Sequence, residues 1–183
     1  MELDKKDRLI LINQYKILTI LNPDESVRYS GYIRTLEQGF ELNYDTMAGW
    51  ITDGMKQEEC GEVVDILEMY RCLNTSFLKL KDKVGINKKH LDFPGFDANE
   101  EEKELAYVEY LLYTLNKFKE FKKRGKYPDH DSRTPALNKY RAMLRVWESL
   151  SNKKILSKGE ILQVLSGEEK GDQLEAAEIR EAN

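Results

Sequence analysis

Apolar residues recur at intervals of three and four along most of the chain, and strictly alternating segments are nearly absent. The spacing predicts helices over about 5–21, 23–38, 57–84, 97–123 and 135–150, with a short helix at about 161–165. Pro23 suits the first turn of the second helix, and Gly39 suits a left-handed cap at its end. The pattern therefore predicts an all-α fold, a single compact domain of about six to eight helices.

The first predicted helix is unusually apolar. Its apolar residues are Leu9, Ile10, Ile12, Ile17, Leu18, Ile20 and Leu21. Because they cover more than one face of a helix, we expect this helix to be buried on several sides.

The sequence contains three N-terminal capping-box patterns, two of which overlap. Asp97 and Glu100 form a D-x-x-E pattern before the fourth predicted helix, and Asn99 with Glu102 repeats it two residues later. Ser157 and Glu160 form an S-x-x-E pattern before the last helix. We expect a helix to begin after each of these boxes.

The net charge of the chain is −4, and it is unevenly placed. Residues 167–183 carry the whole excess of acids, while residues 1–166 are neutral. The last segment is rich in Glu and Ala and has too little apolar surface to offset the entropy of ordering. We therefore predict a folded domain over 1–166 and an acidic, disordered or frayed tail over 167–183. Neither part has the basic excess typical of nucleic-acid binding.

Several features predict a cytoplasmic protein. No apolar run approaches the roughly 18 residues of a membrane-spanning helix. The first 15 residues carry acids among their bases, unlike a signal peptide. Cys60 and Cys72 lie twelve residues apart on one predicted helix, about 18 Å along its axis, which is too far for a disulfide.

A search for catalytic motifs finds no phosphate-binding loop, dinucleotide fingerprint, nucleophile elbow or H-E-x-x-H pair. With only His90 and His130, one chain cannot form a three-histidine zinc site, and we expect His130 to be a solvated loop residue. The sequence thus predicts no metal and no cofactor.

Glu62, Asp65 and Glu68 form a row on the face of the central helix. Such carboxylates can act as acid, base or metal ligand, but metal-binding bundles add histidines that are missing here. We expect a solvated face or pairing with Arg71, Arg141 or Arg145.

Basic residues raise two further alternatives. Residues 97–104 sum to −4 and residues 117–126 to +5, a segregation that fits the helix dipole better than a phosphate site. Residues 136–165 resemble a helix-turn-helix with Lys153, Lys154 and Lys158 near the turn. The last helix lacks base-reading side chains, so we do not expect sequence-specific nucleic-acid binding.

Polar residues interrupt the apolar run of the first helix, and buried polar groups need partners. They define either an internal hydrogen-bond network that fixes helix register or a ligand pocket. The candidate group is Asn13, Gln14, Tyr15, Lys16, Asp65, Glu68, Arg71, Phe96, Asp97 and Arg141.

The chain also resembles a known family. The matching blocks are 9–16 (LILINQYK), 65–70 (DILEMY), 95–99 (GFDAN), Thr134-Pro135, 139–144 (KYRAML) with Trp147, and Leu156-Ser157 to Glu160-Ile161. In this order they resemble the bacterial YfbU family, with a departure at 129–133. The resemblance implies a cytoplasmic, all-helical protein of uncharacterised function, with no agreed catalytic residues or cofactor.

Two functional hypotheses follow. The first is a non-enzymatic interaction or regulatory domain that forms a homodimer, or binds a protein partner, through the apolar first helix or the aromatic-rich helix around Tyr107–Tyr113. The alternative is a small-molecule or phosphoryl-handling enzyme with a polar pocket between helices.

Overall fold

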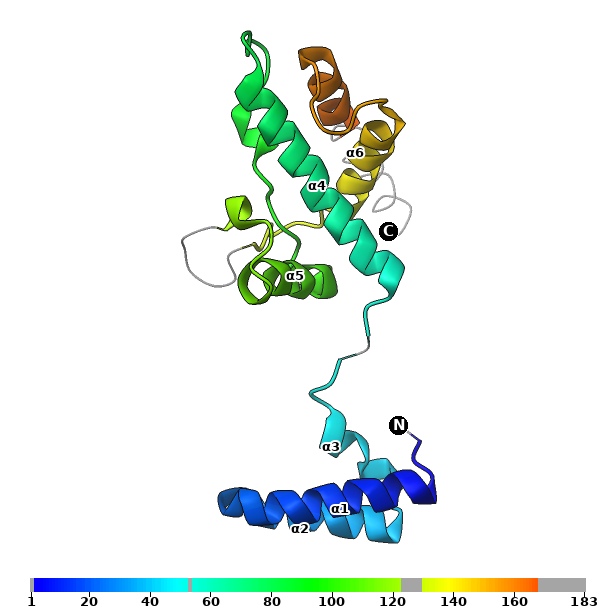
Figure 1. Ribbon diagram of the computed structural model, residues 1–183. Helices are drawn as coiled ribbons and strands as arrows, with labels where there is room; N and C mark the ends of the chain where they lie inside the picture. The colour runs from blue at the N-terminus through cyan, green and yellow to red at the C-terminus, as the bar shows by residue number, and fades with distance from the viewer. Residues whose placement is uncertain (1, 53, 123–129, 168–183) are drawn as a thin grey trace. The chain divides into compact units, whose positions relative to one another are not determined.

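The computed structural model describes residues 2–52, 54–122 and 130–167. The chain divides into two compact units, 1–54 and 55–183, which subdivide the single domain expected from the sequence. The helices are α1 (Lys5–Leu21), α2 (Ser26–Gln38), α3 (Asp45–Ala48), α4 (Gln57–Lys79), α5 (Glu102–Glu109) and α6 (Leu137–Ser149), with a further helix at 158–167 (Figure 1). The described residues contain no strand longer than an isolated bridge, so the predicted all-α fold is confirmed.

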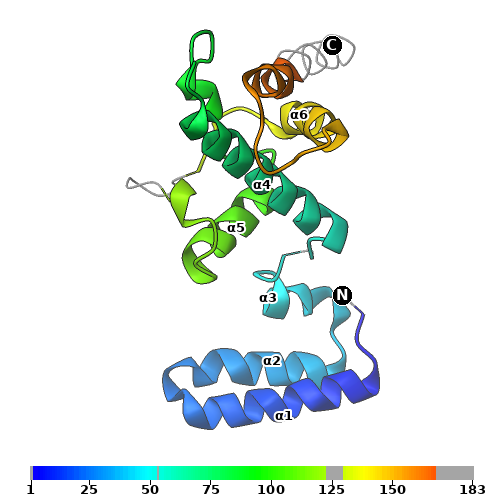
Figure 2. The ribbon, with the colours of Figure 1, turned by 45° about the horizontal axis from the view of Figure 1, so that its top comes forward.

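The first unit is built on a hairpin of α1 and α2, which lie side by side in Figures 1 and 2. Asp4 caps α1: its Oδ1 accepts from the backbone N–H of Asp7 at 2.8 Å, and the Asp7 carboxylate accepts from the backbone N–H of Asp4 at 3.2 Å. A 3-10 turn at Pro23–Glu25 leads into α2, which ends at Gly39 with φ of 71°. The predicted bounds of α1 and the predicted end of α2 are confirmed, whereas α2 begins at Ser26 and not at Pro23.

The core of this first unit is small. It consists of Ile12, Leu36, Tyr44 and Met47, with a few half-buried neighbours. Ile12 is the only described residue of α1 that is buried. Within the unit, the prediction that α1 is buried on several sides is wrong, because α2 and the segment after it cover one face only.

The second unit is organised around α4. This helix packs against α5 and α6, which lie to either side of it in Figures 1 and 2. The core includes a cluster of aromatic rings, in which Tyr70 and Phe96 each meet the ring of Tyr140 edge-on at 5.7 and 5.4 Å. The predicted central helix is confirmed, although it ends at Lys79 because Leu80 adopts an extended conformation with ψ of 135°.

Two segments of this unit run side by side and form an isolated parallel bridge between Phe96 and Asp131. The backbone N–H of Phe96 donates to the His130 carbonyl at 2.9 Å, and that of Ser132 donates to the Phe96 carbonyl at 3.1 Å. The bridge holds His130 in the core, where its ring lies 6.0 Å from that of Phe93. The prediction of a solvated loop histidine is therefore wrong.

The helix expected over 97–123 is shorter in the structure. After α5 the chain forms a π-helical turn at Tyr110–Thr114, and Asn116 and Phe118 then take left-handed conformations that end it. Lys117, Lys119 and Lys122 follow the helix instead of forming its last turn, which removes the helix-dipole explanation for these three residues. Lys123, Arg124 and Lys126 lie outside the described residues, as does the predicted tail from residue 168.

Two further predictions concern the cysteines and the absence of a membrane-spanning helix. Cys60 and Cys72 are free thiols on α4, as the spacing predicts. Among the described helices, none combines the length and the apolar character needed to cross a bilayer.

Candidate functional site

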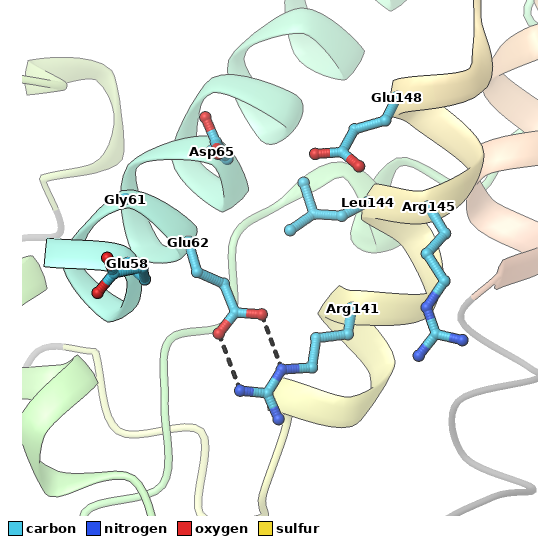
Figure 3. A pocket seen from close by; sticks show the side chains of 8 residues that line it. All are labelled: Glu58, Gly61, Glu62, Asp65, Arg141, Leu144, Arg145 and Glu148. Atoms are coloured by element: carbon cyan, nitrogen blue, oxygen red, sulfur yellow. Dashed lines mark hydrogen bonds and ion pairs between the residues drawn. The ribbon is translucent and has the colours of Figure 1, made fainter. Parts of the chain in front are cut away.

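A cavity of about 570 Å³ lies between α4 and α6 in the second unit (Figure 3). Its walls carry four acidic side chains and two arginines. They are Glu58, Gly61, Glu62 and Asp65 from α4, and Arg141, Leu144, Arg145 and Glu148 from α6. Positions three or four apart share one face of a helix, which is why each helix presents a row of charges to the other.

The centre of this cavity is an ion pair. Arg141 donates from Nε and from a terminal nitrogen to the two carboxylate oxygens of Glu62, at 2.7 and 2.9 Å (Figure 3). This hydrogen bonding raises the pKa of Arg141 above its already high ordinary value. The predicted pairing of the acidic row with Arg141 is thus confirmed for Glu62. Because both side chains are partly exposed, the pair contributes little to stability, of the order of 1 kcal/mol at most.

The cavity can attract a cation or a basic side chain, since acids outnumber bases on its walls. Within the part of the chain that the structure describes, no group of three or more His, Cys, Asp or Glu side chains is placed to hold a metal ion. The charged walls of the cavity are suited to recognising a cation or a basic side chain by its charge.

A second cavity, of about 370 Å³, involves Glu68 and Arg71. The Arg71 guanidinium lies 4.2 Å from the centre of the Phe118 ring and donates to Glu68 at 2.9 Å and to Glu120. The predicted pairing of Glu68 with Arg71 is confirmed. The other lining residues are Cys72, Thr75, Trp147, Lys153 and Lys154.

Phe96 and Asp97 occupy structural positions. Phe96 is fully buried among the aromatic rings of the core. Asp97 Oδ1 accepts from the backbone N–H groups of Asn99 and Glu100 at 2.8 and 2.9 Å, but these bonds close a turn before the helix: α5 begins at Glu102, and neither predicted box supplies its N-cap. The return bond comes from Glu101 instead of Glu100, since Glu101 Oε2 accepts from the Asp97 N–H at 2.9 Å.

Glu101 is the important residue that the sequence analysis missed. Its other oxygen accepts from the backbone N–H groups of Ala136 and Leu137, at 2.7 and 2.6 Å, where α6 begins. One buried carboxylate thus caps the start of α6 and also fixes the turn before α5, 35 residues earlier in the chain. A run of three glutamates at 100–102 gives three possible partners for Asp97, and only the fold selects among them.

The four remaining candidates lie on α1, in the other unit. Asn13, Gln14 and Lys16 are exposed there, so the burial that would have required partners for them is absent within this unit. Tyr15 is half-buried between the rings of Tyr29 and Tyr32, at 5.8 and 5.2 Å. Burial, and then these two tyrosines, raise the pKa of Tyr15. The ten candidates therefore divide between the two units, and a shared site stays a prediction.

The last helix begins at its predicted capping box. The backbone N–H of Ser157 donates to Glu160 at 2.7 Å, and that of Glu160 donates to the Ser157 hydroxyl at 3.3 Å. Bonding from the Ser157 backbone lowers the pKa of Glu160. Nearby, Lys158 donates to Asp82 at 2.7 Å, which partly neutralises one of the three lysines considered for phosphate contact.

Sequence comparison identifies relatives along nearly the whole described chain. The sequence model of the YfbU domain matches residues 1–167. The UPF0304 protein of Methanocaldococcus jannaschii is 40% identical over 168 residues, which cover 90% of this chain and 99% of that relative. The matched region contains both cavities, the aromatic core and all of α1. The chain belongs to the YfbU family.

Proposed function

We propose that this chain is a cytoplasmic, non-enzymatic interaction or regulatory domain that forms a homodimer through α1. The observation that carries the proposal is the exposed apolar face of this helix. Ile17, Ile20 and Leu21 are 55, 78 and 73% exposed, and Leu9 and Ile10 extend the same face toward the start of the helix. A contiguous apolar surface of this kind is characteristic of a protein contact.

The exposed residues of α1 have the spacing of a helix–helix seam. Ile10, Asn13, Ile17 and Ile20 follow one another at steps of three, four and three, as the core positions of a coiled coil do. Ile12 faces the other way, into the small core of the unit. α1 therefore has two apolar sides, and α2 covers one of them.

Burying more apolar surface would also stabilise the first unit. A unit of about 54 residues with four core side chains buries little apolar surface, and domains of this size are marginally stable. Pairing two α1–α2 hairpins along their seams would give a four-helix arrangement with a second core layer.

The seam suits a second copy of the same chain. In an antiparallel pair, Lys5 and Lys6 at the start of one α1 would lie near Asp24 and Glu25, which follow the end of the other. Opposite charges at the two ends favour this orientation. A polar Asn13 inside the apolar row would restrict the pairing to one register, at some cost in stability.

The test is the mass of a seam variant. Ile17→Lys with Ile20→Lys places two charges in the seam, and lysine is at least as good a helix former as isoleucine. We expect light scattering to change from a dimer to a monomer, with unchanged helicity by circular dichroism. The matched control is Leu78→Lys on α4, which adds a lysine at another exposed apolar position and should leave the dimer intact.

Three outcomes separate the possible occupants of the seam. A wild-type dimer lost only in the seam variant supports the proposal. A dimer that survives in the seam variant moves the contact elsewhere, for example to the exposed Tyr110, Tyr113 and Leu115. A wild-type monomer whose α1 amides and side chains are protected would show that the rest of the same chain covers the seam.

The alternative function, a small-molecule or phosphoryl-handling enzyme, is supported by the charged cavity around Glu62 and Arg141. Thermal-shift measurements with divalent metals and nucleotides test it, because a ligand at 100 times its dissociation constant adds about 2.7 kcal/mol. An increase in the unfolding temperature that is lost in Arg141→Met would favour this alternative function. The free thiols of Cys60 and Cys72 support placing either function in a reducing compartment such as the cytoplasm.

A further inference from the structure

The smaller cavity beside Trp147 has features of a ligand site that are independent of the dimer proposal. Its walls come from α4, from α6 and from the loop after α6. At about 370 Å³ it lies within the usual range for small-molecule pockets, roughly 300–1,000 Å³. Trp147 and Cys72 are both buried and give it an apolar wall, while the lysines stand at its exposed edge.

The indole N–H of Trp147 is buried and has no acceptor within the described part of the chain. Trp147 is 7% exposed, and among the described residues no acceptor lies within hydrogen-bond distance of its Nε1. A buried donor without a partner costs about 1–3 kcal/mol. This nitrogen is closed off from solvent, so the part of the Trp147 ring that the cavity presents to a ligand is apolar.

The charges around the cavity favour an anion. Arg71 is balanced by its bonds to Glu68 and Glu120. Lys153 and Lys154 form no ion pair with any residue that the structure describes, so their charges remain for a ligand. The ammonium group of Lys153 lies 5.4 Å from the centre of the Trp147 ring, which places a cation directly beside the apolar wall.

From the volume of the cavity, its apolar wall and the two lysines without ion pairs, we infer that the cavity binds a planar organic anion. The flat body of the ligand packs against the apolar wall of Trp147 and Cys72, and its carboxylate or phosphate group meets Lys153 and Lys154. A planar anion fits better than a bare inorganic ion, because the indole ring and Cys72 offer only apolar contact.

The two tryptophans of the chain allow a direct test. Trp50 is 81% exposed and lies in the other unit, so it serves as an internal reference for Trp147. In the ¹⁵N-labelled full chain, with indole resonances assigned by Trp50→Phe, we titrate benzoate, AMP and inorganic phosphate separately. We expect AMP, benzoate or both to shift the Trp147 indole resonance saturably, with the Trp50 resonance unchanged. Which of the two binds distinguishes a phosphate monoester from a carboxylate.

Variants assign the binding to the cavity. Lys153→Met with Lys154→Met should weaken binding about tenfold or more, as expected for losing hydrogen bonds to a charged group. The matched control, Lys81→Met with Lys88→Met, removes two exposed lysines of the same unit that do not line this cavity and should leave binding unchanged. The inference is overturned if no probe shifts Trp147 at about 10 mM. It is also overturned if both indoles shift together, if phosphate alone binds as tightly as the planar anions, or if the control variant weakens binding equally.

Discussion

The helices α1 and α4 have similar apolar periodicity but very different surroundings. α4 buries residues on most of its length, including Val63, Ile66 and Tyr70, because α5 and α6 lie on two sides of it. α1 buries only Ile12 within its unit and leaves a row of isoleucines exposed. Periodicity therefore identifies both helices, whereas the number of neighbours decides how much of each apolar surface is covered.

The two units also differ in how their cores are held together. The second unit adds long-range polar links to its apolar core, including the Phe96–Asp131 bridge and the Glu101 carboxylate. The first unit has a link from the Arg8 guanidinium to the Leu36 carbonyl at 3.1 Å, but this bond is only partly buried, whereas the bonds of Glu101 to the Asp97 and Ala136 N–H groups are buried. We therefore expect substitutions at the links of the second unit to have the largest effects on the free energy of unfolding.

The largest effect on the free energy of unfolding is expected at Gly95, where the backbone passes close to that of His130. Gly95 has φ of 112°, and a Cβ built on it would lie 1.8 Å from the His130 carbonyl oxygen. Gly95→Ala should therefore lower the free energy of unfolding by about 3 kcal/mol or more, measured by urea denaturation. Gly61→Ala is the control: a Cβ added there would meet nothing within 4 Å, and alanine in a helix should raise stability by about 0.5–1 kcal/mol. Equal changes in stability at the two glycines would contradict the close approach of the Gly95 and His130 backbones.

The next effect is expected at Glu101. Glu101→Ala leaves the N–H groups of Asp97, Ala136 and Leu137 without their carboxylate and should cost about 2–4 kcal/mol in the same denaturation experiment. Glu100→Ala is the matched control, because the described contacts of Glu100 use its backbone and not its carboxylate. If Glu100→Ala proved as damaging as Glu101→Ala, the capping box would be in the register that the sequence suggested.

A smaller effect is expected at the ion pair of the first cavity. A double-mutant cycle of Glu62→Gln and Arg141→Met should give a coupling energy of about 0.2–1 kcal/mol, because both groups are partly exposed. Added salt should reduce the coupling. A coupling of several kcal/mol would instead indicate that the pair is desolvated and that the cavity is closed.

The smallest effect concerns Asp82. Its hydrogen bond with Lys158, and then the bond from the Val84 N–H at 3.0 Å, lower the pKa of Asp82 below 3.8. The ion pair therefore stabilises the fold above pH 3.8 and loses that contribution as the pH falls through the lower folded pKa. A carboxyl NMR titration should find this low pKa, and Lys158→Met should raise it toward 3.8. A pKa that does not change in the variant would exclude the Lys158 contact.

The sequence predicts local structure well where the signal is local. Pro23, Gly39 and the Ser157–Glu160 box mark helix ends correctly, because each acts through the backbone of its own turn. It fails where the outcome depends on distant residues. His130 is buried because its carbonyl accepts from the Phe96 N–H. Glu101 becomes the bonded glutamate because α6 begins beside it, 35 residues later in the chain.

The candidate site shows the same division. Pairing of Glu62 and Glu68 with arginines follows from helical spacing and opposite charge. The second cavity depends on Trp147 and on two lysines after α6, which no spacing rule connects with Arg71. The polar residues of α1 were expected to need partners only because α1 itself was expected to be buried.

The proposed dimer depends on the exposed seam of α1, and the mass of the protein in solution tests the dimer most directly. Size-exclusion chromatography with multi-angle light scattering at micromolar concentration should give twice the chain mass of 21.4 kDa. The Ile17→Lys, Ile20→Lys variant should give the mass of one chain. A wild-type protein that remains monomeric across the same concentrations would contradict the proposed dimer.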